Sequence, residues 1–476
     1  MSHRPTRPPR RRSPRERKRR KTTLPACLRQ VNLHAAGIDI GSRSHWVCVP
    51  EGSCPPGEEV REFGAFTGDL LALAAWLGEC GVTTVAMEST GVYWIPLYEL
   101  LDEMGFEVRL VDARKLKSVP GRKTDVLDCQ WIQQLHTYGL LAGAFRPNEA
   151  VCALRSYHRQ REMLVQSAAR SIQHMQKALT QMNVKLREVL REVTGETGMK
   201  IIRAILSGER DPKQLAALRN RQCANDEGTI AGALHGTWRA EHLFALRQAV
   251  ERYDFYGQQI QACDREIESA LAAFEDRSDG GTLPPRRSRG TRRHVPSVDL
   301  RSALFRMTGV DLVRIEGIDE ITALKVISEI GADVSAFPTV KHFTSWLALA
   351  PGSKITGGKS LSGKTKASAN RVAAALRVAA QSLWRSNSAV GAFLRRKSSH
   401  LGSPKAITAT AHKLARLVYY MLKHGTDYVV RSQEDYEKDH RQRSIRHLQR
   451  RARALGFDIV ESTPPQGLTA LLEALA

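Results

Sequence analysis

Four carboxylates in the first third of the chain are spaced so that they can share a metal ion. Asp39 interrupts the apolar run Ala-Ala-Gly-Ile-Asp-Ile, and a carboxylate inside a buried strand is costly unless a cation or hydrogen bonds compensate it. Glu88 directly follows the apolar segment Val85–Met87. Asp125 and Asp128 lie three residues apart at an expected helix start, so they share one face of that helix.

The chemistry of this set follows from its ligand atoms. The pattern D…E…D-x-x-D offers hard carboxylate oxygens, which are the ligands that Mg²⁺ requires. Two such ions can bind the attacking and leaving oxygens of an in-line phosphoryl displacement, so the set predicts two Mg²⁺ ions as cofactors. Taken singly, each acid also has a structural interpretation: a strand-end turn for Asp39, a surface acid for Glu88, and helix-dipole partners for Asp125 and Asp128.

The segment that positions these acids, residues 32–148, alternates short apolar runs with helical ones. Strands are expected at Ala35–Ile40, His45–Val49, Val60–Phe66, Thr83–Met87 and Glu107–Val111. Helices are expected at Asp69–Cys80, Tyr93–Met104 and Thr124–His136. Three strands at hairpin spacing followed by strand–helix alternation predict an α/β domain, a mixed sheet with helices on its faces. Ribonuclease-H-like nucleases share this order.

Residues 149–278 predict two long helices with heptad seams. The first seam comprises Val165, Ala168, Ile172, Met175, Leu179, Met182, Leu186 and Val189. The second comprises Leu246, Ala249, Tyr253, Tyr256, Ile260, Cys263, Ile267 and Ala270. The two helices are expected to pair, either within one chain or between chains. The alternative is that they are ordinary amphipathic helices of one globular domain.

The charge of the chain predicts a polyanionic partner. Its 476 residues include 72 Lys and Arg against 49 Asp and Glu, a net charge of +23. Residues 1–31 are expected to form a disordered basic arm, residues 279–299 a basic linker, and residues 431–476 a charged tail. No segment is apolar for long enough to span a membrane, and the eight cysteines lack metal-binding spacing. We therefore expect a cytoplasmic protein with reduced cysteines.

The last expected domain, residues 300–430, is mainly helical and carries candidate phosphate contacts. Gly317 lies in a segment similar to a helix-hairpin-helix, although an ordinary tight turn is the alternative. A basic loop follows, whose candidate contacts are Lys354, Lys359, Lys364, Lys366 and Arg371. Gly358–Thr365 also matches the nucleotide-binding pattern GxxxxGKS/T, but no β-rich run precedes it, so we reject a P-loop. His412 is assigned no catalytic role.

Several motifs together resemble those of one family, the DEDD transposases of the one-ten group of bacterial insertion sequences, particularly its eleven-eleven-like branch. In the first domain they are Gly37-Ile38-Asp39-Ile40-Gly41, Met87-Glu88-Ser89-Thr90-Gly91-Val92-Tyr93-Trp94 and Gly121-Arg122-Lys123-Thr124-Asp125-Val126-Leu127-Asp128. In the last domain they are Leu349-Ala350-Pro351-Gly352, Thr356-Gly357-Gly358-Lys359 and Ala411-His412-Lys413-Leu414-Ala415.

The resemblance implies a bacterial, nucleoid-associated DNA recombinase that moves a mobile element. It implies an acid quartet on Asp39, Glu88, Asp125 and Asp128, a structured guide RNA, DNA partners, and a dimer or tetramer. It also implies a serine that attacks the DNA phosphate, and the matching residue here is Thr356. Threonine has the same hydroxyl, but its methyl group crowds the attack.

Three alternatives remain open from the sequence. Ser360 or Ser362 could replace Thr356 as the nucleophile if the loop bends differently. The chain could be a structure-selective nuclease of the same fold, which needs the acids but no hydroxyl nucleophile. It could also be a basic nucleic-acid-binding protein without chemistry, the state expected if Thr356 has disabled a former transposase.

Overall fold

The computed structural model describes residues 29–89, 91–112, 125–285, 296, 298–352, 354–357, 359–368, 370–425 and 433–460. The chain divides into two compact units, Met1–Arg146 and Pro147–Ala476. No helix among the described residues is both long and apolar enough to cross a membrane. The seven cysteines in the described part are all free thiols. The predicted basic arm, residues 1–31, lies almost entirely outside the described residues.

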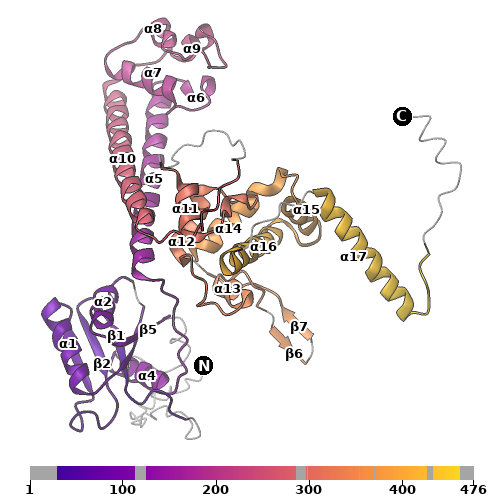
Figure 1. The fold of residues 1–476 in the computed structure, drawn as a ribbon. Coiled ribbons are helices and arrows are strands. Elements are labelled where there is room, and N and C mark those ends of the chain that lie inside the picture. The colour runs from indigo at the N-terminus through magenta and orange to yellow at the C-terminus, as the bar shows by residue number, and fades with distance from the viewer. Residues whose placement is uncertain are drawn as a thin grey trace, which may run out of the picture. The chain divides into compact units, whose positions relative to one another are not determined.

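The first unit is built on a five-stranded mixed sheet in the order β3-β2-β1-β4-β5 (Figure 1). The pairs β3-β2 and β2-β1 are antiparallel, whereas β1-β4 and β4-β5 are parallel. The strands are β1 (Ala35–Ile40), β2 (Ser44–Cys48), β3 (Val60–Gly64), β4 (Thr84–Glu88) and β5 (Glu107–Val111). This confirms the predicted mixed sheet, with strand ends shifted by at most two residues.

Helices cover both faces of this sheet. On one face, Ile38 and Met87 pack against α1 (Thr67–Glu79) and α2 (Ile95–Glu103) in the main core. On the other face, Ala86 and Val111 pack against Ile132 of α4 (Asp125–Thr137). Because successive strand residues point to opposite faces, each strand residue can be assigned to one of these two helical layers.

The second unit begins with two long helices that pair along their length, α5 (Glu149–Gln181) and α10 (Ala240–Ala272). The predicted seam residues Ala168, Met175, Leu246 and Ile267 are all buried. Both seams therefore pack against each other within the chain, which decides between the two pairings that the sequence left open. The first seam was extended too far: α5 ends at Gln181, and its last two predicted members lie in a separate short helix.

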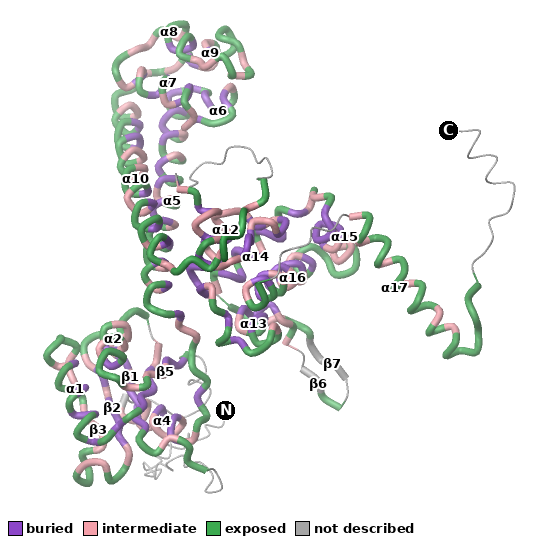
Figure 2. The backbone as a smooth tube through the Cα atoms, in the orientation of Figure 1, coloured by how far each residue is buried: buried purple, intermediate pink, exposed green. Residues whose placement is uncertain are grey.

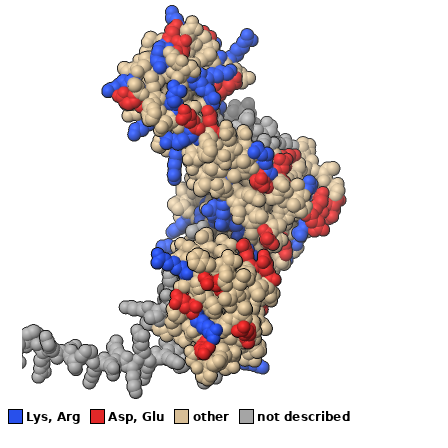
Figure 3. Space-filling model, turned by 90° about the vertical axis from the view of Figure 1, so that its left-hand side faces the viewer, with Lys and Arg blue, Asp and Glu red and all other residues tan. Residues whose placement is uncertain are grey.

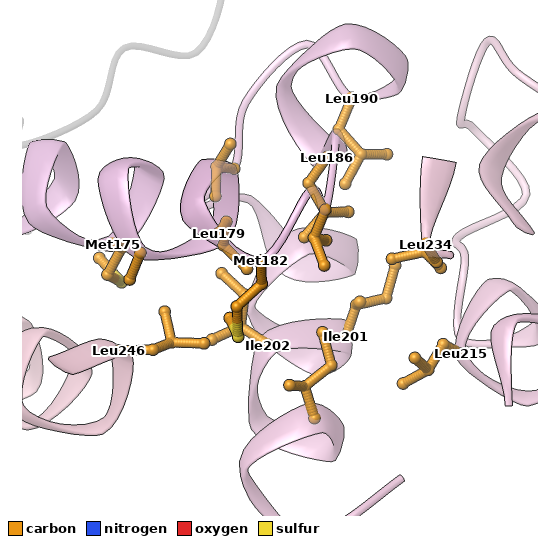
Figure 4. Close-up of a cluster of buried hydrophobic side chains, with 14 of the residues drawn as sticks. Met175, Leu179, Met182, Leu186, Leu190, Ile201, Ile202, Leu215, Leu234 and Leu246 are labelled. Atoms are coloured by element: carbon orange, nitrogen blue, oxygen red, sulfur yellow. The ribbon is translucent and has the colours of Figure 1, made fainter. Parts of the chain in front are cut away.

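A cluster of short helices closes the end of the α5–α10 pair. Met182, Ile201, Leu215 and Leu234 converge there in one apolar cluster, part of which is shown in Figure 4. Its helices are α6 (Leu186–Val189), α7 (Glu196–Leu206), α8 (Pro212–Ala217) and α9 (Glu227–Ala233). In Figure 3 its surface carries Lys and Arg interspersed with Asp and Glu. Short helices joined by turns explain why this segment has no long sequence period.

The rest of the second unit is mainly helical, as predicted (Figure 2). Its helices are α11 (Leu300–Thr308), α12 (Glu320–Ile330), α13 (Val340–Trp346), α14 (Arg371–Gln381), α15 (Ala389–Leu401), α16 (Ser403–His424) and α17 (Gln433–Ala454). One antiparallel hairpin, β6 (Lys354–Thr356) and β7 (Lys359–Ser362), stands between α13 and α14. The sequence was interpreted as a loop without a β-rich run here, and that interpretation was wrong.

Ion pairs attach α5 to the helices of this last part. Arg159 donates two hydrogen bonds to the carboxylate of Glu329 in α12, at 2.9 and 2.7 Å. Glu162 accepts from Lys325 of α12 at 2.5 Å and from Arg371 of α14 at 3.1 Å. Two acids on two elements thus fix the direction in which α5 meets α12 and α14.

Candidate active site

The strand register brings two of the four predicted acids side by side. In the parallel pair β1-β4, Ala35 is opposite Thr84 and Ile38 is opposite Met87. The same register, continued by one residue, sets Asp39 beside Glu88 at the carboxyl ends of the two strands. Neighbouring strands are about 4.8 Å apart, so the two carboxylates lie within reach of one ion.

Both acids point to the α4 face of the sheet. Ile38 and Met87 belong to the core under α1 and α2, and Ala86 belongs to the core under α4. Asp39 and Glu88 therefore lie on the α4 layer, by the alternation of strand side chains. This layer is half-open at the strand ends, since both residues are partly exposed.

Helix α4 runs antiparallel to these strands and presents its acidic start at the same edge. Near its carboxyl end, the carbonyl of Thr137 accepts from the backbone N–H of Asn32, just before β1. His136, also in the last turn, lies 2.9 Å from the hydroxyl of Thr84 at the start of β4. The first turn, with Asp125 and Asp128, therefore lies toward the strand ends that carry the other two acids.

A glycine sets how closely α4 approaches. A Cβ atom on Gly37 would lie 2.2 Å from the backbone nitrogen of Gln133 and 2.5 Å from the carbonyl oxygen of Cys129. No side chain fits in that contact, so α4 packs directly on the backbone of β1. Asp39 follows Gly37 on the same face and one pleat nearer to the strand end. This role of Gly37 was not predicted from the sequence, although a glycine two residues before a buried-strand acid is a visible signal.

The pKa of the Cys129 thiol agrees with the placement of α4 beside Asp39. Burial raises the pKa of the Cys129 thiol above its usual range, and the neighbouring Cys48 and Asp39 raise it further. Cys129 directly follows Asp128 in α4, so the charge of Asp39 is felt in the first turns of that helix. The side chain of Asp125 and the predicted motif residues 121–124 lie outside the described residues.

The oxygen donors suit Mg²⁺ in type, and three of them lie at one edge of the sheet. Among the described side chains, however, no three His, Cys, Asp or Glu residues come close enough together to form a metal site. The structure therefore brings Asp39 and Glu88 together and directs Asp128 toward them, without closing an oxygen cage. Closure of that cage by all four acids stays a prediction.

The predicted nucleophile is the last residue of β6 and is exposed. Thr356 pairs with Lys359 of β7, and Gly357, directly after Thr356, has a φ of 56°, which favours glycine. Ser360 pairs with Ile355 and Ser362 with Lys354, farther from the turn. Strand β7 also occupies the place where a P-loop would wrap a phosphate, so the rejection of a P-loop is confirmed.

The predicted phosphate contacts have different surroundings. Lys364 and Lys366 are exposed after β7, whereas the side chains of Lys354 and Lys359 lie outside the described part. Arg371 is half exposed and donates to Glu162 of α5, as described above.

Gly317 precedes α12 in the expected hairpin-like turn, with a φ of 88°. A Cβ there would lie 2.7 Å from the carbonyl oxygen of Ala379 in α14, so this glycine serves a close helix contact. Its contact with a phosphate stays a prediction.

Comparisons with known families match both parts of this arrangement. Residues 36–184 match the profile of the DEDD transposase domain of IS110 elements. Residues 309–395 match the transposase domain described as the IS116/IS110/IS902 family. A comparison with curated protein sequences gives no significant match.

The five-stranded mixed sheet, its carboxylates and the first match define a ribonuclease-H-like phosphoryl-transfer enzyme. Its mainly helical carboxyl-terminal part is the second transposase domain. The chain is therefore an IS110-family transposase, in agreement with the resemblance that its motifs predicted.

Proposed function

We propose that this transposase cuts and rejoins DNA at the ends of a bacterial mobile element through a covalent protein–DNA intermediate. The observation that carries the proposal is the acidic edge, defined as Asp39 and Glu88 with the acidic first turn of α4. Two strands and one helix carry these acids, and all three elements bring them toward one edge of one sheet face; this supports the proposal, because helix-dipole partners or surface acids do not require such an arrangement.

Each acid has a stated part in this proposal. Asp39 and Glu88 hold Mg²⁺ from the strand ends, and Asp125 and Asp128 complete the site from α4. Bound there, Mg²⁺ supplies charge neutralisation for the phosphate and lowers the pKa of a coordinated hydroxyl. Gly37 and His136 act as positioning residues because they fix the distance and direction of α4.

Thr356 is the proposed nucleophile. Its oxygen forms a bond to the DNA phosphorus, the bond from phosphorus to one deoxyribose oxygen breaks, and the threonine proton goes to the released oxygen. The exposed position at a Gly-Gly turn supports access to a large substrate. Exposed Lys364 and Lys366, together with Lys354 and Lys359, stabilise the negative charge on the attacked phosphate.

We further propose that target choice comes from a structured guide RNA and that the active complex is a dimer or tetramer. The net charge of +23 supports two polyanionic partners. Assembly from several copies would let the acidic edge of one protomer serve the hairpin of another. The α5–α10 seams are satisfied within the chain and are not the proposed contact between protomers.

The test is a trapped adduct. The full-length protein is incubated with DNA carrying the element ends, in Mg²⁺ or in EDTA, and the protein–DNA complex is digested for mass spectrometry. We expect a phosphopeptide mapped to Thr356, present in Mg²⁺ and absent in EDTA. Thr356→Ser should retain the adduct, and Thr356→Ala should eliminate it.

Other outcomes separate the alternatives. A phosphopeptide at Ser360 or Ser362 would reassign the nucleophile within the same hairpin. Cleavage without any adduct would favour a plain nuclease, and binding without cleavage would favour a catalytically inactive copy.

A further inference from the structure

A basic cavity of about 800 Å³ lies between α15, α16 and α17. Its lining residues belong neither to the acidic edge nor to the β6–β7 hairpin. Five Lys and Arg side chains line it against one acid, Asp439. The five are Arg396, Lys397, Lys413, Arg416 and Arg443. Such a concentration of one charge in a concave site raises the local concentration of anions.

The third wall of the cavity is fixed to the other two. Arg395 of α15 donates to the side chain of Gln433, the first residue of α17, at 2.6 Å. The same guanidinium donates to the carbonyl oxygens of Trp384 and Ser386, at 3.0 and 2.8 Å. Phe393 and Tyr436 meet edge to face across α15 and α17, with ring centroids 6.5 Å apart. These contacts hold α17 against α15, so α17 forms one wall of the cavity.

The cations lie against neutral rings. The Lys413 ammonium is 4.8 Å from the ring centroid of Phe393 and 5.5 Å from that of Tyr436. The Arg396 guanidinium is 5.8 Å from the Tyr436 centroid and donates to Nδ1 of His440 at 2.7 Å. Since arginine cannot accept a hydrogen bond, this ring nitrogen must be unprotonated. These ring and imidazole partners carry no negative charge, so they leave the arginine charge available to a ligand.

Basic side chains continue beyond the cavity along α17. Arg443 lines the cavity, and Arg446, Arg450 and Arg453 follow at steps of three and four residues, which places them on one face of the helix. All four are exposed. A row of cations that leads out of a cavity fits a polymeric anion better than a small one.

We infer that this cavity binds an unpaired segment of a nucleic-acid strand. Arg396, Arg416 and Lys397 contact its phosphates, and one unstacked base lies against the rings of Phe393 and Tyr436. Aromatic contact requires a base face that a duplex keeps stacked, so the site selects single strands. The same chemistry recognises RNA and DNA, and the 2′-hydroxyl is the difference that a measurement can use.

The test measures binding in EDTA, so it does not depend on cleavage or on the proposed metal site. Fluorescence anisotropy of the full-length protein is followed with labelled oligouridine, oligothymidine and a DNA duplex over a series of salt concentrations. The variants are Arg416→Gln, which removes an exposed charge, and Tyr436→Leu, which removes an aromatic face. The control is Lys213→Gln, an exposed charge on α8.

For single strands, Arg416→Gln should lower the affinity several-fold and reduce the slope of log affinity against log salt by about one. Tyr436→Leu should lower the affinity about tenfold without changing that slope. The control should change neither. A larger effect with oligouridine identifies RNA as the ligand, and a larger effect with oligothymidine identifies DNA.

Two results would overturn the inference. One is that Arg416→Gln binds single strands as the wild type does. The other is that both variants lose affinity for duplex and for single strands equally, because the cavity would then bind any polyanion by charge without selecting single strands. Should Tyr436→Leu loosen α17 in circular dichroism, the exposed Arg416→Gln still decides the outcome.

Discussion

The acidic edge of the first unit and the basic cavity of the second use different scaffolds for opposite charges. The acids stand on strands and one helix whose spacing is set by backbone contacts, including the register of β1 with β4 and the approach at Gly37. The cavity is lined by long Lys and Arg side chains on three helices. Metal chemistry needs ligands held within fractions of an ångström, whereas a flexible strand is bound by adaptable cations.

The largest difference between the two regions should appear in cleavage. Asp39→Asn removes the charge of a proposed metal ligand with little change of shape, and we expect cleavage in Mg²⁺ to fall about 100- to 1,000-fold, the scale for one preorganised electrostatic group. Asp102→Asn, an exposed acid on α2 at the opposite face, is the control. Initial rates on DNA with element ends measure both. Full activity of Asp39→Asn would remove the acidic edge from the mechanism.

Acid should destabilise both units through their buried histidines. Burial lowers the pKa of His136 in the first unit and of His158 in the second to about 4. The unfolded chain binds these protons near pH 6.5, so stability falls as the pH drops from about 6.5 to about 4, by up to roughly 3 kcal/mol per histidine.

Urea unfolding at pH 7.5 and 5.0 measures this loss. His136→Gln should reduce the pH dependence of the first unit, because it removes the buried group whose pKa is lowered in the folded chain. An unchanged pH dependence in His136→Gln would show that the pKa of this histidine is the same in the folded and the unfolded chain.

A methyl group at Gly37 should affect the acidic edge and leave the basic cavity intact. Gly37→Ala forces α4 away from β1, and we expect a loss of about 1–3 kcal/mol in stability together with slower cleavage. Gly78→Ala in α1, where an added Cβ meets nothing within 4 Å, is the matched control. Single-strand binding in EDTA should be unchanged in both variants. A simultaneous loss of binding would mean that the two regions are not independent.

The smallest effect is expected from the basic arm. Deletion of residues 1–25 should flatten the salt dependence of binding without removing specific binding, because we expect the basic residues of the arm to attract phosphates without recognising a sequence. Anisotropy titrations at several salt concentrations measure the slope. An unchanged slope would mean that the arm does not contact nucleic acid.

The sequence predicted the first unit well because its strands and helices differ in apolar period. The acids were found because Asp39 breaks an apolar run, and their convergence could be argued from strand order. Sequence could not show that Gly37 sets the approach of α4, since that contact joins residues far apart in the chain. It also missed the β6–β7 hairpin, because β6 is only three residues long and the four residues of β7 include no β-branched side chain.

The basic cavity was missed for a related reason. His412 and Lys413 were visible in one motif, but the cavity exists because α17 returns to α15, and helical spacing within α16 carries no information about α17. The seam of α5 likewise could not show whether its partner helix lies in the same chain or in another copy. The buried pair Arg161–Asp264, at 2.5 Å between α5 and α10, had no local signal either.

The position of α5 in the chain has a consequence for synthesis. The apolar seam of α5 leaves the ribosome before α10 exists, because residues 182–239 are synthesised between the two helices. The ion pair of Arg159 in α5 with Glu329 can form only after a further 170 residues have been added. At a synthesis rate of roughly 5–20 residues per second, the nascent helix α5 lacks its packing partners for many seconds. A truncated messenger would release a chain with an uncovered α5, which favours aggregation or proteolysis. Helix α5 therefore has its full set of partners only after the chain has been synthesised as far as α12.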